Sequence, residues 1–238
     1  MSAETLQLPY GKEAIEFQLI RRDRRTLSIS VRPDLGIDVV APMDAPLERI
    51  FEKVRKRAPW IRKQLHFFSQ FQPRTLERQY LSGETHLYLG RQYKLKVVRD
   101  IQQSVKLYRG AIIVQSLKPR RTDITQALVE DWYHDRAHVK FRERLVECQK
   151  RFSRPGDYEP SGFVIRQLAQ RWGSMTPGGR LILNRALIRS SVDAIDYVIT
   201  HELCHMRHNH HGPEFFRLLK RVMPDWEKCK MKLERQLA

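Results

Sequence analysis

The segment HELCHMRHNHH at residues 201–211 constrains this chain more than any other part of it, because it holds five of the nine histidines. The apolar stretch AIDYVIT precedes it, and residues 190–193 have the spacing of a helical capping box. We therefore expect an amphipathic helix that begins near Ser191 and carries the first histidines. In such a helix His201 and His205 lie one turn apart on one face.

The letters HELCH match the His-Glu-x-x-His pattern, which on a helix is typical of a zinc site that performs chemistry. The imidazoles of His201 and His205 can both reach one ion, and Glu202 lies beside that ion rather than among its ligands. Glu202 would then be the base that takes a proton from a metal-bound water. In the alternative interpretation, the histidines face solvent and Glu202 only solvates the helix.

A hydrolytic zinc site requires a third protein ligand and an open position for water. Asn209 should end the helix, and Gly212–Pro213 should begin the next one with the proline in its first turn. Because the chain reverses between these points, we favour His211 as the third ligand, with His210 and then His208 as alternatives. The expected cofactor is one Zn²⁺ per chain, although imidazole also binds Mn²⁺, Co²⁺ and Ni²⁺.

The net charge indicates which partners the surface attracts. The sequence has 44 Lys+Arg against 27 Asp+Glu, a formal charge of +17. Such a surface attracts nucleic acid, anionic lipid heads, phosphorylated metabolites or acidic proteins, unless it is simply a solvated basic surface. No apolar run reaches the roughly eighteen residues that a membrane helix needs, no secretory signal is evident, and the three cysteines are scattered. We therefore expect a cytoplasmic protein that does not enter a membrane.

The order of the apolar patterns predicts an α+β fold without internal repeats, divided near residue 118. Residues 1–118 should form a β-rich region with two short helices. Its clearest signals are a hairpin around Gly36 and helical periodicity over residues 46–70, which Pro59 should divide into two helices. Further strands are expected at residues 86–89, 92–98, 104–109 and 111–116, between glycines that favour turns.

Residues 119–238 should form the region that contains the histidine cluster. We expect a long helix from Thr122 to about Phe152, then a hairpin whose strands FVIRQLAQRWGSM and RLILNRALI are joined by TPGG. The helix with the histidines follows. Pro213 should begin the first of two C-terminal helices, and Pro224 should separate it from the second.

Three residues near the predicted site are candidates for substrate binding. An edge strand RLILNR could pair with an extended peptide, and Asn184 at its end could bond a substrate carbonyl. Arg185, together with Arg171 and Arg180, could hold an anionic substrate, and Trp172 could form the floor of a pocket. Each also has a simpler interpretation, as a turn-forming asparagine, solvated arginines and a core aromatic residue.

Four stretches, SGETHLYLGRQYKL, RWGSM, LILN and YVITHELCHMRHNHHGPEFF, resemble the YgjP-like metallopeptidases, which are related to the SprT-like proteins and the wider zincin group. The resemblance extends over about residues 19–233 and implies a zincin-like catalytic region with Glu202 as general base. The implied zinc ligands are His201, His205 and His211. Met175 stands where the family usually has cysteine, so no catalytic thiol is assigned there. His208 stands where metzincins require glycine, which separates the chain from that group.

The leading hypothesis is a zinc-dependent metallopeptidase or related hydrolase that acts on a peptide or protein. A first alternative is a metal-dependent nucleotide hydrolase that cleaves a phosphoanhydride at the same site, because a basic surface attracts phosphorylated small molecules. A second alternative is a nucleic-acid-associated protein in which the zinc is structural. It would bind nucleic acid with a steep dependence on salt.

Overall fold

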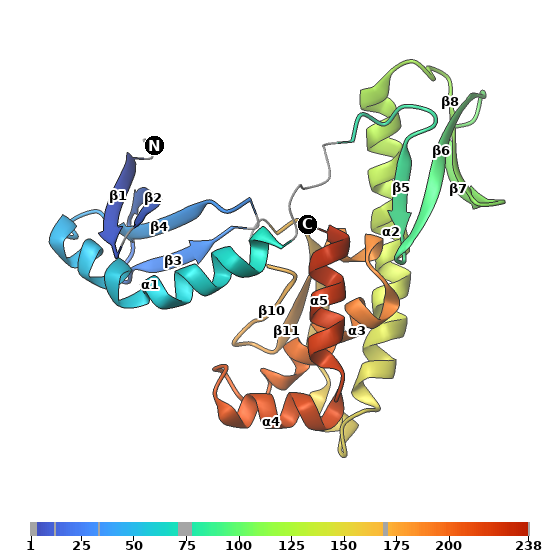
Figure 1. The fold of residues 1–238 in the computed structure, drawn as a ribbon. Coiled ribbons are helices and arrows are strands. Elements are labelled where there is room, and N and C mark those ends of the chain that lie inside the picture. Colours follow the sequence, from blue (N-terminus) through green and yellow to red (C-terminus); the bar gives the residue numbers. More distant parts are fainter. Residues whose placement is uncertain (1–3, 12, 33, 71–77, 169–170, 238) are drawn as a thin grey trace. The chain divides into compact units, whose positions relative to one another are not determined.

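The computed structural model describes residues 4–11, 13–32, 34–70, 78–168 and 171–237, which fold into five α-helices, two 3₁₀ helices and three sheets (Figure 1). The predicted α+β class is confirmed. By their internal contacts the residues divide into two compact units, Met1–Thr75 and Leu76–Leu237. Each unit has its own hydrophobic core.

The first unit is a four-stranded sheet with one helix. Its strands are β1 (Glu4–Tyr10), β2 (Glu13–Arg22), β3 (Ser28–Val31) and β4 (Ile37–Pro42), in the order β1-β2-β4-β3. The hairpin predicted around Gly36 is the antiparallel pair β3–β4. Alternate strand residues point inward, as the period of a strand requires, and pack against helix α1 (Leu47–Ser69). The core of this unit includes Phe17, Leu19 and Val39 from the sheet and Ile50, Val54, Ala58 and Ile61 from the helix.

Helix α1 is one continuous helix, whereas the sequence predicted two short helices that meet at Ala58–Pro59. Pro59 lies inside it. A proline in a helix interior costs about 3 kcal/mol. The buried stripe Ile50, Val54, Ala58 and Ile61 continues through this position on one face, and burial of each large aliphatic side chain contributes about 1.5–3 kcal/mol. Packing of the whole stripe on the sheet therefore outweighs the cost of the proline.

The second unit begins with another four-stranded sheet, which packs on a long helix. Its strands are β5 (Thr85–Tyr88), β6 (Arg91–Arg99), β7 (Ser104–Tyr108) and β8 (Ala111–Ser116), and the helix is α2 (Thr122–Gln149). All four strands and the helix were predicted within a few residues. Figure 1 shows this sheet beside the N-terminal half of α2.

The two four-stranded sheets have the same topology, although the sequence showed no internal repeat. In each sheet the first two strands are antiparallel, the second and fourth are parallel, the third and fourth are antiparallel, and a helix follows. The second sheet accordingly has the order β5-β6-β8-β7. A sheet that packs on a helix needs apolar residues at alternate positions, not identical residues. The motif can therefore repeat without visible similarity between the two stretches of sequence.

The remaining elements build the histidine region. They are η1 (Pro155–Tyr158), β9 (Gly162–Arg166), β10 (Gly173–Met175), β11 (Arg180–Asn184), η2 (Arg185–Arg189), α3 (Val192–Cys204), α4 (Pro213–Val222) and α5 (Trp226–Leu237). The predicted helix with the histidines and the two C-terminal helices are confirmed. The first strand predicted for the hairpin is instead split into β9 and β10, and the end of the second is the 3₁₀ helix η2. Ser191 precedes α3 as expected, but no side-chain capping bond forms there.

In the sequence, the boundary between the two compact units follows residue 75, whereas we expected a boundary near residue 118. The reason is that the β5–β8 sheet shares a core with α2, through residues such as Leu95, Ile112 and Tyr133. The turn between β5 and β6 also docks on η2, where the Gly90 amide donates to the Arg189 carbonyl at 3.1 Å. A Cβ at Gly90 would lie 2.8 Å from Cβ of Ser191, so this approach requires glycine. The sheet thus supports the start of helix α3.

Candidate metal centre

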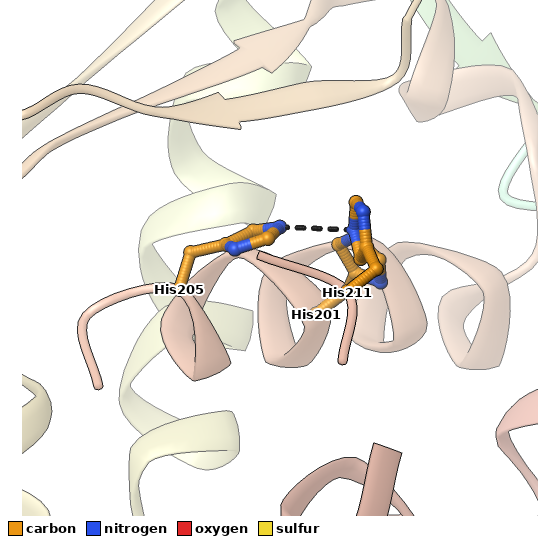
Figure 2. A group of neighbouring side chains, drawn as sticks. All are labelled: His201, His205 and His211. Atoms are coloured by element: carbon orange, nitrogen blue, oxygen red, sulfur yellow. Dashed lines mark hydrogen bonds between the residues drawn. The ribbon is translucent and has the colours of Figure 1, made fainter. Parts of the chain in front are cut away.

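The end of helix α3 and the loop beyond it bring three histidines together (Figure 2). His201 lies in the last turn of the helix, and His205 is the residue at which the helix ends. The loop before α4 returns the chain, so that His211 Nε2 lies 3.0 Å from His201 Nε2 and 3.1 Å from His205 Nε2. The candidate ligand atoms of the three residues all lie within 4.8 Å of one another. His208 and His210, the other candidates for third ligand, are not members of this group.

The geometry and chemistry of these rings fit a bound metal ion. Two nitrogens at about 2.1 Å from one zinc ion cannot be more than about 4.2 Å apart, and the closest pairs satisfy this limit. His205 Nδ1 lies 2.9 Å from the His208 carbonyl oxygen, which can only accept a hydrogen bond. The proton of neutral His205 is therefore on Nδ1, and Nε2 directs a lone pair at the centre of the cluster. Ring nitrogens of metal ligands are commonly oriented in this way by a carbonyl.

Burial favours the neutral form of two of the three clustered histidines, His201 and His211. It is the main reason that the pKa of His201 is lowered to about 3, and the neighbouring His211 and His205 lower it further. Burial also lowers the pKa of His211, again with a contribution from His205. Since a metal ion binds the neutral imidazole, both shifts favour binding near neutral pH.

Aromatic rings pack against the three clustered histidines. The Phe215 side chain is completely buried, and its ring centroid lies 4.9 Å from His201, 4.6 Å from His205 and 4.8 Å from His211. Phe215, from the helix that follows the loop, therefore contacts all three rings. The ring centroid of Tyr197 lies 5.8 Å from that of His201, and this contact was not predicted from the sequence. The position of Tyr197 four residues before His201 on the same helical face was the available signal.

Glu202 lies in the same cleft and is only 7% exposed. Burial raises the pKa of its carboxyl to about 7, against the opposing effects of the Met175 backbone amide and the Arg171 guanidinium. The side chain passes close to the backbone of Gly173, where a Cβ would lie 2.9 Å from Glu202 Cγ and 3.0 Å from Oε1. Only glycine at position 173 leaves this space free. This role of the glycine in RWGSM was not predicted from the sequence.

The cleft has a volume of about 910 Å³ and two walls. One wall is strand β10 with its flanking residues. The other is helix α3 with residues 205–212, the loop between α3 and α4, which we call the histidine loop. The residues that line it include Trp172, Gly173, Met175, Tyr197, Glu202 and the three clustered histidines.

The strand at the cleft is β10, whereas the sequence suggested the later strand RLILNR. That strand is β11, which lies in the centre of its sheet between β10 and β9. It therefore has no free edge. The backbone N–H of Asn184 donates to the Trp172 carbonyl, and the backbone N–H of Thr176 donates to the Arg180 carbonyl. Because residues that bond to a neighbouring antiparallel strand alternate along a strand, Ser174 of β10 also directs its main-chain groups at β11. The main-chain groups of Gly173 and Met175 consequently point away from β11.

Asn184 has a structural role and does not line the cleft. Its side-chain amide donates to the carbonyls of Leu168 at 2.9 Å and Arg171 at 3.0 Å, and its oxygen accepts from the Ala186 amide at 3.1 Å. These bonds hold the connection between β9 and β10 against β11. The proposed contact of Asn184 with a substrate carbonyl has no support, because each of its polar atoms already has a protein partner.

The other two candidates for substrate binding differ from each other. Arg185 forms an ion pair with Glu130 at 3.0 Å and is not among the described residues that line the cleft, so the structure gives it a role in attaching η2 to α2. Trp172 does line the cleft, and its indole nitrogen donates to Glu234 at 3.3 Å. Of the flanking arginines, Arg171 lines the cleft and Arg180 does not.

An α+β unit that gathers three imidazoles and a buried carboxylate in one open cleft is typical of metal-dependent hydrolases. A family model described as YgjP-like, metallopeptidase domain, matches residues 25–236, and the chain belongs to this family. The resemblance inferred from the sequence is confirmed. Comparison with curated proteins gave no match. Membership of the family implies a hydrolase that uses a metal ion.

Proposed function

We propose that this protein is a zinc-dependent metallopeptidase in which His201, His205 and His211 hold the ion and Glu202 is the general base. The observation that carries the proposal is the approach of the three Nε2 atoms, at 3.0 and 3.1 Å, beside a buried carboxylate in an open cleft. A purely structural site would not require this carboxylate, nor a cleft of this volume in front of it.

A zinc ion bound by these residues would supply a Lewis acid that polarises the scissile carbonyl and makes a water molecule more acidic. Glu202 would accept the proton of the attacking water and return it to the leaving amine. In the metal-free protein burial raises the pKa of Glu202 to about 7, which makes its carboxylate a stronger base than an exposed glutamate. Tyr197 and Phe215 would keep the histidine rings in place during this exchange.

Strand β10 offers a place for the main chain of an extended peptide. It is an edge strand of its sheet, and the main-chain groups of Gly173 and the carbonyl of Met175 point away from its only partner strand among the described residues, whereas the Met175 amide is already bonded to Glu202. An extended peptide can add to such an edge through backbone hydrogen bonds. The scissile bond would then lie between β10 and α3, within reach of Glu202.

Hydrolysis of a nucleotide at this cleft has less support. Among the described residues of its wall, Arg171 is the one lysine or arginine, whereas phosphate chains are normally held by several cations. The positive charge of the chain is therefore not gathered at the proposed reaction site. For this reason we favour a peptide or protein as substrate.

The test combines metal analysis with one conservative variant. We expect about one zinc ion per purified chain, and hydrolysis of casein or a peptide library that falls by about 10²–10⁴-fold in Glu202→Gln. Zinc content should be unchanged in that variant, because Glu202 is not a ligand. The matched control is Glu227→Gln, which removes the charge of an exposed residue on α5 and should retain full activity. Near-wild-type hydrolysis by Glu202→Gln would exclude the proposed role.

For the compartment we propose the cytoplasm. Cys148, Cys204 and Cys229 are all buried and free, as expected for a protein in a reducing environment. In the described ranges, none of the helices combines the length and the apolar character that crossing a membrane requires.

A further inference from the structure

A second cavity, of about 780 Å³, lies on the other side of the histidine loop. Its walls are residues 150–154, which follow α2, the 3₁₀ helix η1, the loop between α3 and α4, and α4 itself. Six of its lining residues are lysine or arginine and two are acidic. The basic residues are Lys150, Arg151, Arg154, Arg207, Arg217 and Arg221.

Three of these six cations already have acidic partners. Lys150 pairs with Glu147, Arg151 with Asp196 and Arg217 with Glu214.

The other three cations, Arg154, Arg207 and Arg221, form no ion pair with any residue in the described part of the chain, and Asp157 is the one lining carboxylate left to offset them. The charges of Arg207 and Arg221 both act on the Tyr158 hydroxyl, where they oppose the increase of its pKa by burial. Both arginines line the cavity together with Tyr158. Unpaired guanidinium groups that converge on a concave surface are the usual means of binding phosphate.

The shape of the cavity favours a compact ligand over a nucleic-acid strand. Phe152 and Leu218 are buried at its base, and Val222 lies beside them. A cavity of this size is comparable to a small-molecule site. Binding of a nucleic acid would instead use an extended groove with exposed aromatic rings on which bases stack. Tyr158 is only 9% exposed, and its ring stacks on that of Phe152 with 3.9 Å between the ring centroids.

We propose that this cavity binds a small, multiply charged phosphorylated anion, with Arg154, Arg207 and Arg221 as its principal contacts. The site is separate from the metal cleft and shares no lining residue with it. It also accounts for part of the net positive charge that the proposed hydrolytic function does not use.

Residues of the histidine loop line both the cavity and the cleft of the proposed metal centre. Arg207 and His208 line the cavity, and the carbonyl of His208 accepts the hydrogen bond from His205 Nδ1. A ligand that contacts Arg207 therefore immobilises the segment that orients one of the proposed metal ligands. Binding should slow amide hydrogen exchange in residues 206–210, which gives a readout that does not depend on hydrolytic activity.

The experiment is a calorimetric titration of the zinc-loaded full chain with fructose 1,6-bisphosphate, with fructose as the unphosphorylated control. The variant Arg154→Glu/Arg221→Glu should weaken binding by at least about tenfold, because two charge-assisted contacts become repulsive. The variant Arg99→Glu/Arg120→Glu makes the same change of charge at two exposed positions outside the cavity and should bind as the wild type does. Zinc content and circular dichroism verify that each variant is folded.

The remaining outcomes either support or overturn the proposal. Slower exchange in residues 206–210 on addition of the bisphosphate, in the wild type but not in Arg154→Glu/Arg221→Glu, would support the site. The proposal is overturned if the wild type does not bind the bisphosphate at millimolar concentration, or if both double variants bind equally well. It is also overturned if a single-stranded oligonucleotide binds through Arg154 and Arg221 and the bisphosphate does not compete, because the ligand would then be a nucleic acid.

Discussion

Substitution of Gly173 by alanine should move the proposed general base without touching the metal ligands. A Cβ at this position would lie 2.9 Å from Glu202 Cγ, 3.0 Å from its Oε1 and 3.0 Å from Val198 Cγ1. Carbon atoms in contact prefer about 3.5–4.0 Å, so the neighbouring groups must retreat by roughly 0.5–1 Å. Val198 is held in the core, and the Glu202 side chain is therefore the group that moves.

The expected cost follows from these distances. Overpacking of a well-packed site costs about 1–3 kcal/mol of folding free energy. A displacement of a reacting group by about 1 Å can reduce the rate by about 10²-fold. We therefore expect Gly173→Ala to reduce kcat for peptide hydrolysis by up to about 100-fold and to lower the free energy of unfolding by about 1–3 kcal/mol, with zinc content unchanged.

The assay compares kcat, zinc per chain and urea unfolding in Gly173→Ala and in Ser174→Ala. Ser174 is the next residue of the same strand and also lines the cleft, but truncation of its side chain introduces no clash. It should keep near-wild-type kcat and stability. A Gly173→Ala protein with wild-type kcat would refute the idea that this glycine positions Glu202, and loss of zinc together with activity would show that the perturbation reaches the ligands.

Three other changes test separate parts of the structure. His211→Ala should lose zinc, whereas His210→Ala should retain it, as measured by metal analysis after dialysis; the reverse result would move the third ligand to the neighbouring residue. Asp196→Asn should lower the free energy of unfolding by about 2–4 kcal/mol, because it leaves Arg144 and Arg151 without their buried partner, whereas Asp193→Asn at an exposed ion pair should cost less than about 1 kcal/mol. Equal urea midpoints for these two variants would contradict the assignment. The pKa of His201 is lowered to about 3 in the folded protein, so the unfolded chain binds a proton first as pH falls below about 6.5. Metal-free protein should therefore lose stability between pH 6.5 and pH 3, and His201→Gln should show a smaller loss; identical pH profiles of the urea midpoint would refute the burial of a neutral ring.

The histidine cluster could be predicted from the sequence because it depends on local geometry. A period of 3.6 residues places His201 and His205 on one face. The helix ends at His205, earlier than the expected end at Asn209, whereas Pro213 begins the next helix as expected. The helices and most strands were predictable for the same reason. Pro59 is the exception, because the burial that holds α1 together across it comes from a sheet that local rules do not describe.

The wall of the cleft opposite α3 was not predictable, because it depends on strand pairing. Nothing in the stretch RLILNR indicates that β11 lies between two other strands, one parallel and one antiparallel. The partners of Asn184 are carbonyls 13 and 16 residues earlier in the chain, and Arg185 pairs with a glutamate on α2. The role of Gly173 similarly depends on a side chain that comes 29 residues later, so only the folded structure reveals it.

The two arrangements of four strands and a helix differ in how far their helices reach. The helix of the first arrangement has 23 residues and, within its own unit, packs against one sheet. The helix of the second has 28 residues and extends past its sheet to reach β9, η2 and α3. A change in the length of α1 should therefore disturb only its own unit, whereas a change in the length of α2 should also displace the elements that carry the histidines.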